Sequence, residues 1–268
     1  MKTLSSITIP HGISDRTGGV SQGVYASMNT SFFGDDEREC VFENIKRSLD
    51  AIGCDAKTIV ATQQIHSNHI VIIDLSTDFQ AFHKIETAQS ALNDYELYVV
   101  PECDGLITHR TDVVLMTFYA DCVPLIFFDS KKNIAATVHS GWKGTSNKMC
   151  KTAIDTLVLQ GCEVSDIRVG IGQSAGVCCY EVDTPVIDLF SKTFTQSEIR
   201  QFVFDKEEEG KYAIDLKKAN QMLCLASGIL EEHIEIIDEC TLCNSELYFS
   251  HRRTGYPRGS MSAFIQVK

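Results

Sequence analysis

The sequence predicts a single α/β domain of mixed strands and helices that spans residues 1–268. Three observations lead to this class. Apolar runs typical of strands recur along the whole chain, and segments with helical periodicity lie between them. No repeat, low-complexity tract or Pro- and Gly-rich boundary divides the chain. A chain of 268 residues is also long enough to bury a sizeable core without a staple.

The N-terminal part is expected to contain an ordered loop followed by an amphipathic helix. Residues 11–36 are rich in Gly, Ser and Asn but also carry aromatic side chains, which favours a structured loop over a linker. In residues 37–52 the apolar side chains fall at helical spacing, and Gly53 is suited to end the helix. Residues 76–102 have no clear period and receive no assignment.

The rest of the chain alternates strands with further helices. Residues 145–160 and 215–227 each have one apolar helical face followed by Gly, and a shorter helix is expected over residues 185–190. Residues 248–255 are expected to form a basic, aromatic loop. We expect strands over 58–63, 70–75, 104–108, 113–118, 167–171, 234–237 and 261–267, and within two apolar runs at 119–129 and 134–144.

Composition and charge argue against several classes of function. The net charge is −12, whereas binding to a nucleic acid backbone relies on a cationic patch. No apolar span reaches 18 residues, so we expect no membrane-spanning segment. The N-terminus does not resemble a secretory signal, and the 11 scattered cysteines suit reduced thiols. We therefore expect a cytoplasmic protein.

Cys122 and His139 are each placed near the end of a strand-like run, in 119–129 and 134–144. A thiol and an imidazole at adjacent strand ends can share one site. His66 is the natural third member because it lies in a short polar turn between two predicted strands. Three such ligands leave one tetrahedral position open, which is the arrangement of a catalytic zinc. Copper binds the same ligand types and stays an alternative.

The same residues allow a different chemistry. Cys122 could be a nucleophile, with His139 as its base and Asp121 or a more distant carboxylate as the orienting group, as in thiol hydrolases. The spacing of these residues does not decide between the two hypotheses, and metal retained after purification would favour the first. Cys240 and Cys243 form a lone C-x-x-C pair, which without a second pair favours two packed thiols over a metal site.

Eight short motifs follow one another in order along nearly the whole chain. They are Gly-Gly-Val-Ser at 18–21, Tyr-Ala-Ser-Met-Asn at 25–29, Gln-Ile-His at 64–66, Asp-Gly-Leu-Ile-Thr at 104–108, Ala-Asp-Cys-Val-Pro at 120–124, Val-His-Ser-Gly-Trp-Lys-Gly at 138–144, Cys-Cys-Tyr-Glu-Val at 178–182 and Phe-Ser-His-Arg-Arg at 249–253. Each is weak alone, but together they resemble the laccase-domain proteins. That family was once labelled multicopper polyphenol oxidases and is now associated with purine nucleoside phosphorylase activity.

The resemblance implies a fold, an activity and a ligand set. The implied fold is one α/β (mixed α+β) domain in which central mixed sheets are flanked by helices. The implied activity is phosphorolysis of adenosine, inosine and 5′-methylthioadenosine, with adenosine deamination in some members, so the expected partners are a purine nucleoside and phosphate. The zinc ligands of the family fall on His66, Cys122 and His139. A related branch resembles peptidoglycan editing factors, which remove a wrong amino acid from a UDP-MurNAc precursor, and this stays an alternative.

Substrate contacts are expected from a few polar residues. We expect Arg47, Lys143 and Asn29 to contact phosphate or ribose, and Asp121 to orient a ligand or to transfer a proton. Lys143 replaces the Arg that the family usually has in this motif. The family's Thr-Gly-Arg-Met segment is not matched around Arg258, so no role is transferred to that residue. An oxidase would need several coppers, which eight histidines without a dense His-x-His cluster do not readily supply.

Overall fold

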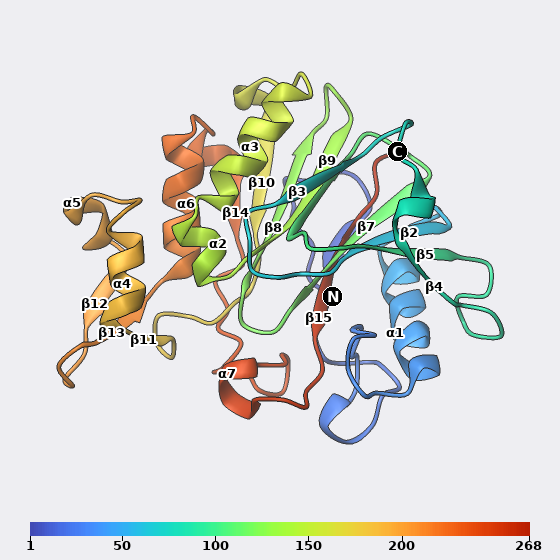
Figure 1. The fold of residues 1–268 in the computed structure, drawn as a ribbon, viewed down its shortest axis with the longest axis horizontal. Helices are drawn as coiled ribbons and strands as arrows, with labels where there is room; N and C mark the ends of the chain where they lie inside the picture. The colour runs from blue at the N-terminus through green and yellow to red at the C-terminus, as the bar shows by residue number, and fades with distance from the viewer.

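Two six-stranded sheets pack face to face at the centre of the molecule (Figure 1). The computed structural model describes residues 1–268. The first sheet has the order β1 (His11–Ile13), β15 (Met261–Ile265), β7 (Val113–Tyr119), β2 (Thr58–Thr62), β5 (Glu96–Val100) and β4 (His83–Ile85). The second has the order β14 (Ile234–Ile236), β10 (Ile167–Ile171), β8 (Val123–Asp129), β9 (Ile134–Ser140), β6 (Gly105–Thr108) and β3 (Ile70–Ile73).

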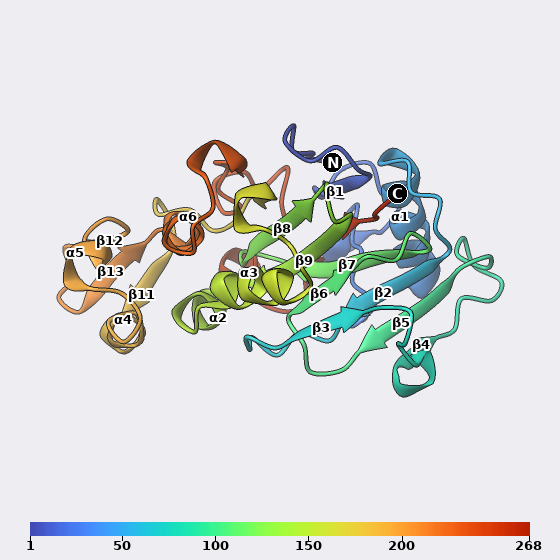
Figure 2. The same cartoon turned by 90° about the horizontal axis from the view of Figure 1, so that it is seen from above.

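Helices cover the outer faces of both sheets. The first sheet packs against α1 (Arg38–Ala51), and the second against α3 (Met149–Leu159) and α6 (Leu216–Ala226), as Figure 2 shows from above. A third, small sheet extends from one end of the molecule with the order β11 (Glu181–Asp183), β13 (Lys211–Ile214) and β12 (Val203–Asp205). Two short helices, α4 (Thr184–Phe190) and α5 (Gln196–Ile199), accompany it.

The central strands are apolar throughout because they are buried on both faces. Every residue of β7, β8 and β9 is buried. Leu115 and Ile126 point into the core between the sheets, whereas their neighbours Val114 and Leu125 point outward into the cores that contain α1 and α3. A strand covered on both faces reads as a continuous apolar run, which is the pattern of this part of the sequence.

The predicted class, a single domain of mixed sheets flanked by helices, is confirmed. The predicted helices at 37–52, 185–190 and 215–227 correspond to α1, α4 and α6, and each predicted strand has a counterpart in the two large sheets. The unassigned residues 76–102 contain β4, β5 and a 3₁₀ turn at Phe79–Ala81. The predicted loop at 248–255 contains α7 (His251–Thr254), and the small third sheet was not predicted.

The prediction of one continuous helix over 145–160 is wrong. The segment forms α2 (Trp142–Ser146) and α3, which are separated because Lys148 adopts a left-handed conformation with φ 59°. The carbonyl of Ser146 accepts a hydrogen bond from the hydroxyl of Thr193 instead of continuing the helical ladder. No helix is both long and apolar enough to span a bilayer.

Candidate active site

Three links between the two large sheets meet at one edge of the molecule. β2, β5 and β7 are parallel, so their carboxyl ends lie at the same edge of the first sheet. Each is followed by a link into β3, β6 or β8 of the second sheet, and these links carry His66, Asp104 and Cys122. His139 lies near the end of β9 and pairs with Pro124 at the start of β8, so it reaches the same edge.

The structure brings His66, Cys122 and His139 together. One ligand atom from each residue lies within 4.8 Å of the others, and Cys122 Sγ is 3.9 Å from His66 Nε2. The two imidazole rings meet edge to face at 4.9 Å. Gly141 makes this approach possible, because a Cβ atom there would lie 2.8 Å from Cys122 Sγ. These three residues could hold a metal ion.

Asp104 fixes two of the three candidate ligands. Its side chain is fully buried, and Oδ1 accepts hydrogen bonds from His139 Nδ1 at 2.8 Å and from the backbone N–H of His66 at 3.0 Å. The other oxygen, Oδ2, accepts from the backbone N–H groups of Ile65 and Ser67 and from the Ser67 hydroxyl. This carboxylate therefore holds the backbone around His66, which has φ 61°, and leaves Nε2 of His139 free for a ligand.

The charges of the site favour a thiolate. Burial raises the pKa of the Cys122 thiol, but the charge and hydrogen bonds of His139 and then of His66 outweigh burial and lower it to about 6. Burial lowers the pKa of His139, but the negative charge of Cys122 and the hydrogen bond to Asp104 raise it above its ordinary value. Because of this lowered pKa, Cys122 can act as an anionic ligand or as a nucleophile.

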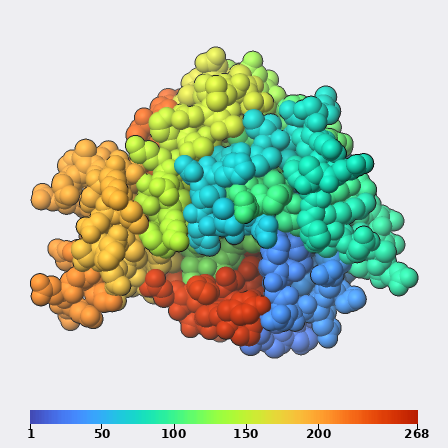
Figure 3. All heavy atoms as spheres, viewed as in Figure 1, coloured from blue at the N-terminus to red at the C-terminus, as the bar shows by residue number.

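A cavity of about 390 Å³ opens over these residues. In Figure 3 the red C-terminal segment borders the blue N-terminal segment, and green atoms lie between it and the cyan segment on this face of the molecule. The aromatic side chains of Phe118, Trp142 and Tyr180 form part of the cavity wall, and Arg252 and Arg258 supply positive charge. This volume is in the range of pockets that bind small organic molecules.

The C-terminal segment reaches the cavity because of strand pairing. β15 is antiparallel to β7 with Met261 opposite Tyr119, so the residues that precede β15 lie beside the link that carries Cys122. Arg258 is half-buried and donates to His251 Nδ1, to the Gly259 carbonyl and to the Ser260 hydroxyl, none of which is a carboxylate. Burial lowers the pKa of this arginine. It lines the cavity as a cation that forms no ion pair, although the charges of Asp121 and Cys122 act in the opposite direction and raise its pKa.

The structure places Asp121 beside His66, Cys122 and His139, but its hydrogen bonds are not those expected for a group that orients His139. It lines the cavity with φ 95°, and its two oxygens accept hydrogen bonds from the Thr241 hydroxyl and from the backbone N–H of Arg252. The carboxylate that contacts His139 is Asp104 instead. Asp121 therefore ties two C-terminal segments to the link that carries Cys122.

The three residues expected to contact phosphate or ribose do not line the cavity. Arg47 pairs with Glu43 one turn earlier on α1, on the outer side of the first sheet. Lys143 is exposed, with its ammonium group 5.5 Å from the centre of its neighbour Trp142. Asn29 is buried and accepts a hydrogen bond from the backbone N–H of Ser260. Of the three, only Asn29 supports the cavity, because it holds Ser260, which lines the cavity wall.

The sequence does not point to two further residues of the site. The pattern of residues 104–108 predicts only a strand, although Asp104 begins the Asp-Gly-Leu-Ile-Thr motif and precedes the observed strand by one residue. The sequence indicates no role for Arg258 because the residues around it depart from the pattern of the laccase-domain proteins. The available signal was its position just before the last strand, whose pairing with β7 brings it to the site.

Fold and site together define an α+β protein with a candidate metal centre at one edge of two packed sheets. The chain belongs to the multi-copper polyphenol oxidoreductase laccase family, whose model matches residues 10–268, so the predicted family is confirmed. The chain is 32% identical over 255 residues to purine nucleoside phosphorylase YlmD of Geobacillus stearothermophilus, covering 95% of this chain and 88% of that protein. It is 28% identical to adenosine deaminase RL5 of an unknown prokaryotic organism, covering 89% of this chain and 86% of that one. The crystal structure of Bacillus licheniformis hypothetical protein YfiH matches with a TM-score of 0.84 and 32% identity, covering 96% of this chain and 92% of that chain.

Proposed function

We propose that this protein is a zinc-dependent purine nucleoside phosphorylase that acts on adenosine, inosine and 5′-methylthioadenosine. The observation that carries the proposal is a single cavity that combines the trio of His66, Cys122 and His139 with Arg258, a cation that forms no ion pair. A reaction between a nucleoside and phosphate needs both a polarising centre and a site for an anion. The relative named purine nucleoside phosphorylase YlmD supports this substrate class.

The donor set of the trio fits zinc. One thiolate and two imidazoles are ligands that Zn²⁺ prefers, and three protein ligands leave a position open for a substrate or water oxygen. Bound there, zinc would act as a Lewis acid that polarises such an oxygen. Asp104 would keep Nδ1 of His139 protonated, so that Nε2 carries the lone pair that a metal needs.

Arg258 and Arg252 are the residues that we assign to phosphate. The hydrogen bonds of Arg258 use Nε and Nη1, which leaves Nη2 for an anion in the cavity. The guanidinium of Arg252 lies 4.8 Å from the centre of the Tyr180 ring and is held by the Glu181 carbonyl. Two fixed guanidinium groups can orient phosphate toward C1′ of the ribose, where the new C–O bond forms as the C1′–N bond to the purine breaks.

The aromatic wall suits a purine. Phe118, Trp142 and Tyr180 line the same cavity and offer flat apolar surface to a purine ring. Burial raises the pKa of the Tyr180 hydroxyl, so this group stays protonated at neutral pH and can donate a hydrogen bond to a purine nitrogen. Gln64, whose amide is held by the backbone of Phe118, adds a polar group at the edge of this wall.

The test is incubation with inosine or adenosine, with and without phosphate, followed by separation of free base and ribose 1-phosphate. We expect base release to require phosphate. A charge-assisted hydrogen bond is worth about 1.5–3 kcal/mol, so Arg258→Gln is expected to raise KM for phosphate by about 10- to 100-fold. Arg258→Lys keeps the charge and is expected to recover part of this loss.

Arg47→Gln is the matched control, because Arg47 is an arginine outside the cavity and its exposed ion pair contributes little. Its KM for phosphate is expected to equal that of the wild type. Base release without phosphate would replace phosphorolysis by hydrolysis. If nucleosides are inert while a muramyl-serine amide is cleaved, the peptidoglycan-editing alternative is correct.

Deamination of adenosine is a second candidate, favoured by the relative named adenosine deaminase RL5. The assay distinguishes it, because deamination converts adenosine into inosine without phosphate and without loss of the base. The thiol hydrolase alternative keeps a geometric basis, since Cys122, His139 and Asp104 form a connected series. It predicts activity that survives a chelator but is lost when Cys122 is alkylated, whereas the zinc proposal predicts loss with the chelator and recovery when zinc is restored.

A further inference from the structure

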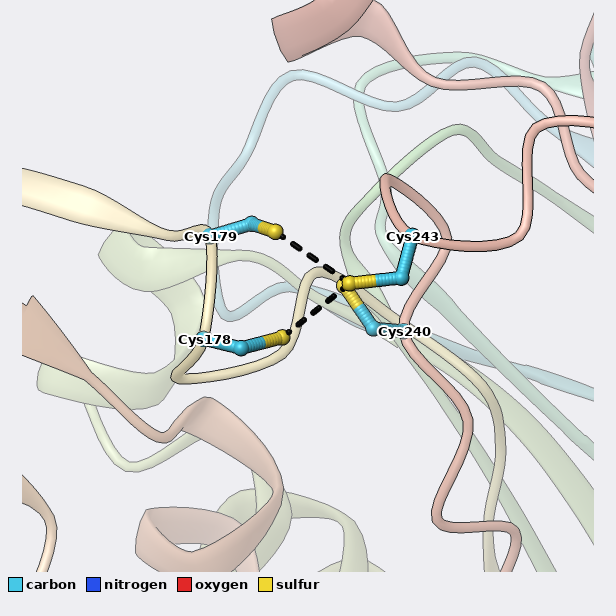
Figure 4. A group of neighbouring side chains, drawn as sticks. All are labelled: Cys178, Cys179, Cys240 and Cys243. Atoms are coloured by element: carbon cyan, nitrogen blue, oxygen red, sulfur yellow. Dashed lines mark hydrogen bonds between the residues drawn. The ribbon is translucent and has the colours of Figure 1, made fainter.

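Four cysteines meet outside the cavity, where two distant segments lie side by side (Figure 4). Cys178 and Cys179 belong to the link between β10 and β11, and Cys240 and Cys243 belong to the segment between β14 and α7. In Figure 4 the four side chains point toward one another. Their sulfur atoms all lie within 4.8 Å of one another.

The sequence alone favours packed thiols for the C-x-x-C pair because it contains no second C-x-x-C pair. The structure supplies a second pair of cysteines from the adjacent residues Cys178 and Cys179. Cys243 Sγ lies 3.4 Å from the sulfur of each of them. Zinc–sulfur bonds of about 2.3 Å place the sulfurs of a tetrahedral site about 3.8 Å apart. The cluster therefore has the size of a four-thiolate site.

The backbone around the cluster is built to hold it. A bridge pairs Ser174 with Cys240, and the N–H of Thr241 donates to the Ser174 carbonyl, so the two segments are already joined. The N–H of Gly176 donates to Cys240 Sγ at 3.2 Å. Amide donors of this kind stabilise a negatively charged sulfur ligand.

Gly176 shows how closely the segments approach. A Cβ atom at this position would lie 3.0 Å from Cys240 Cβ and 3.3 Å from Cys178 Sγ. The two segments could not keep this spacing with a larger residue. Packed apolar thiols do not explain the arrangement, because Cys178 and Cys243 are exposed to solvent. A single disulfide would use two of the sulfurs and leave the other two unpaired.

We propose that Cys178, Cys179, Cys240 and Cys243 bind one Zn²⁺ in a structural site separate from the His66–Cys122–His139 centre. Soft thiolates select zinc over the hard cations Mg²⁺ and Ca²⁺, and four thiolates leave no open position for a substrate. The ion would clamp the link that leads to Tyr180 against the turn that contains Thr241, and both segments form or support the cavity wall.

The test begins with a Cys122→Ser/His66→Ala variant, which lacks two of the three candidate ligands of the active site but keeps the four-cysteine cluster. Purified under reducing conditions from zinc-containing medium, it is expected to hold one zinc per chain by elemental analysis. Adding Cys178→Ser and Cys243→Ser is expected to remove that zinc. The matched control adds Cys40→Ser and Cys54→Ser instead, which removes two free thiols outside the cluster and should leave the zinc in place.

A second readout does not depend on the folding of the cluster variants. In the Cys122→Ser/His66→Ala protein, Co²⁺ added to the metal-free chain is expected to give the intense sulfur-to-metal absorption of a tetrathiolate site. Chelation is expected to expose four additional fast-reacting thiols. Absence of both signals, a disulfide among the four cysteines under non-oxidising purification, or iron instead of zinc would overturn the assignment.

Discussion

Replacing Asp104 by Asn keeps the shape of the side chain but replaces one of its two acceptor oxygens by an NH₂ group, which donates hydrogen bonds. Five donors converge on this carboxylate, two on Oδ1 and three on Oδ2. An amide has only one acceptor oxygen, so its NH₂ group must face donors at the other edge. The Oδ2 edge is the better place for it, because the Ser67 hydroxyl can turn and accept. The backbone N–H groups of Ile65 and Ser67 then lose their acceptor.

The expected loss of stability follows from the two hydrogen bonds to a buried charge that are removed. Each is worth about 1.5–3 kcal/mol, and the new bond to Ser67 offsets part of the loss, so we expect the free energy of unfolding of the metal-free protein to fall by about 3 kcal/mol. The bond from His139 Nδ1 survives but no longer ends on a charge. Mutation of such a partner typically weakens metal affinity by about 10- to 100-fold.

Urea denaturation of the metal-free protein measures the first effect, and competition with a chromogenic chelator measures the second. Asp129→Asn is the matched control. Asp129 is also buried at an end of β8, but its Oδ2 has no hydrogen-bond partner and can be replaced by NH₂, and it lies at the opposite end of the strand from Cys122. Metal affinity of the control should equal that of the wild type. An Asp104→Asn protein that is destabilised but binds metal as tightly as the wild type would show that Asp104 supports the fold and not the ligands.

Three further outcomes follow from the site. Gly141→Ala is expected to reduce metal retention, measured by elemental analysis. The new methyl group would lie 2.8 Å from Cys122 Sγ and 3.2 Å from His66 Cδ2 and would push these ligands apart. Unchanged retention would mean that neither ligand is held in place. In the metal-free protein at pH 7, iodoacetamide should alkylate Cys122 before Cys54, as followed by mass spectrometry. The reason is that the pKa of Cys122 is lowered to about 6, whereas burial raises the pKa of Cys54 to about 12. The reverse order would contradict the charge distribution of the site. Adding zinc back should protect Cys122 and raise the Tm in a concentration-dependent way, and a Tm independent of zinc would exclude binding to the folded state.

The candidate ligands could be predicted because local sequence signals place them. Cys122 lies between two long apolar runs and His139 near the end of the next, so their positions at strand ends follow from the pattern of burial. His66 lies in a polar turn between two clear strands. The side of the sheets on which these ends meet depends on the parallel pairing of β2 with β7, which strand patterns do not specify.

The residues that we propose for phosphate could not be predicted in the same way. A positive charge in a sequence does not say which face of the fold it occupies, and Arg47 and Arg258 are equally plausible on charge alone. Arg47 lies on the helix that covers the outside of the first sheet. Arg258 reaches the cavity only because the last strand returns to pair with β7, a contact between residues far apart in the chain.

The dependence on strand pairing also explains why local sequence motifs do not predict the four-cysteine cluster. Its pairs come from the links that follow β10 and β14, which are parallel neighbours in the second sheet, so their carboxyl ends must lie together. Asp121 connects this cluster to the cavity, since its two oxygens bind Thr241, which lies inside the C-x-x-C turn, and the backbone of Arg252. Loosening the cluster should therefore displace Arg252 while leaving Asp104 and its bonds to His66 and His139 intact. A loss of phosphate affinity without a loss of metal from the His66–Cys122–His139 centre would be the consequence of that connection.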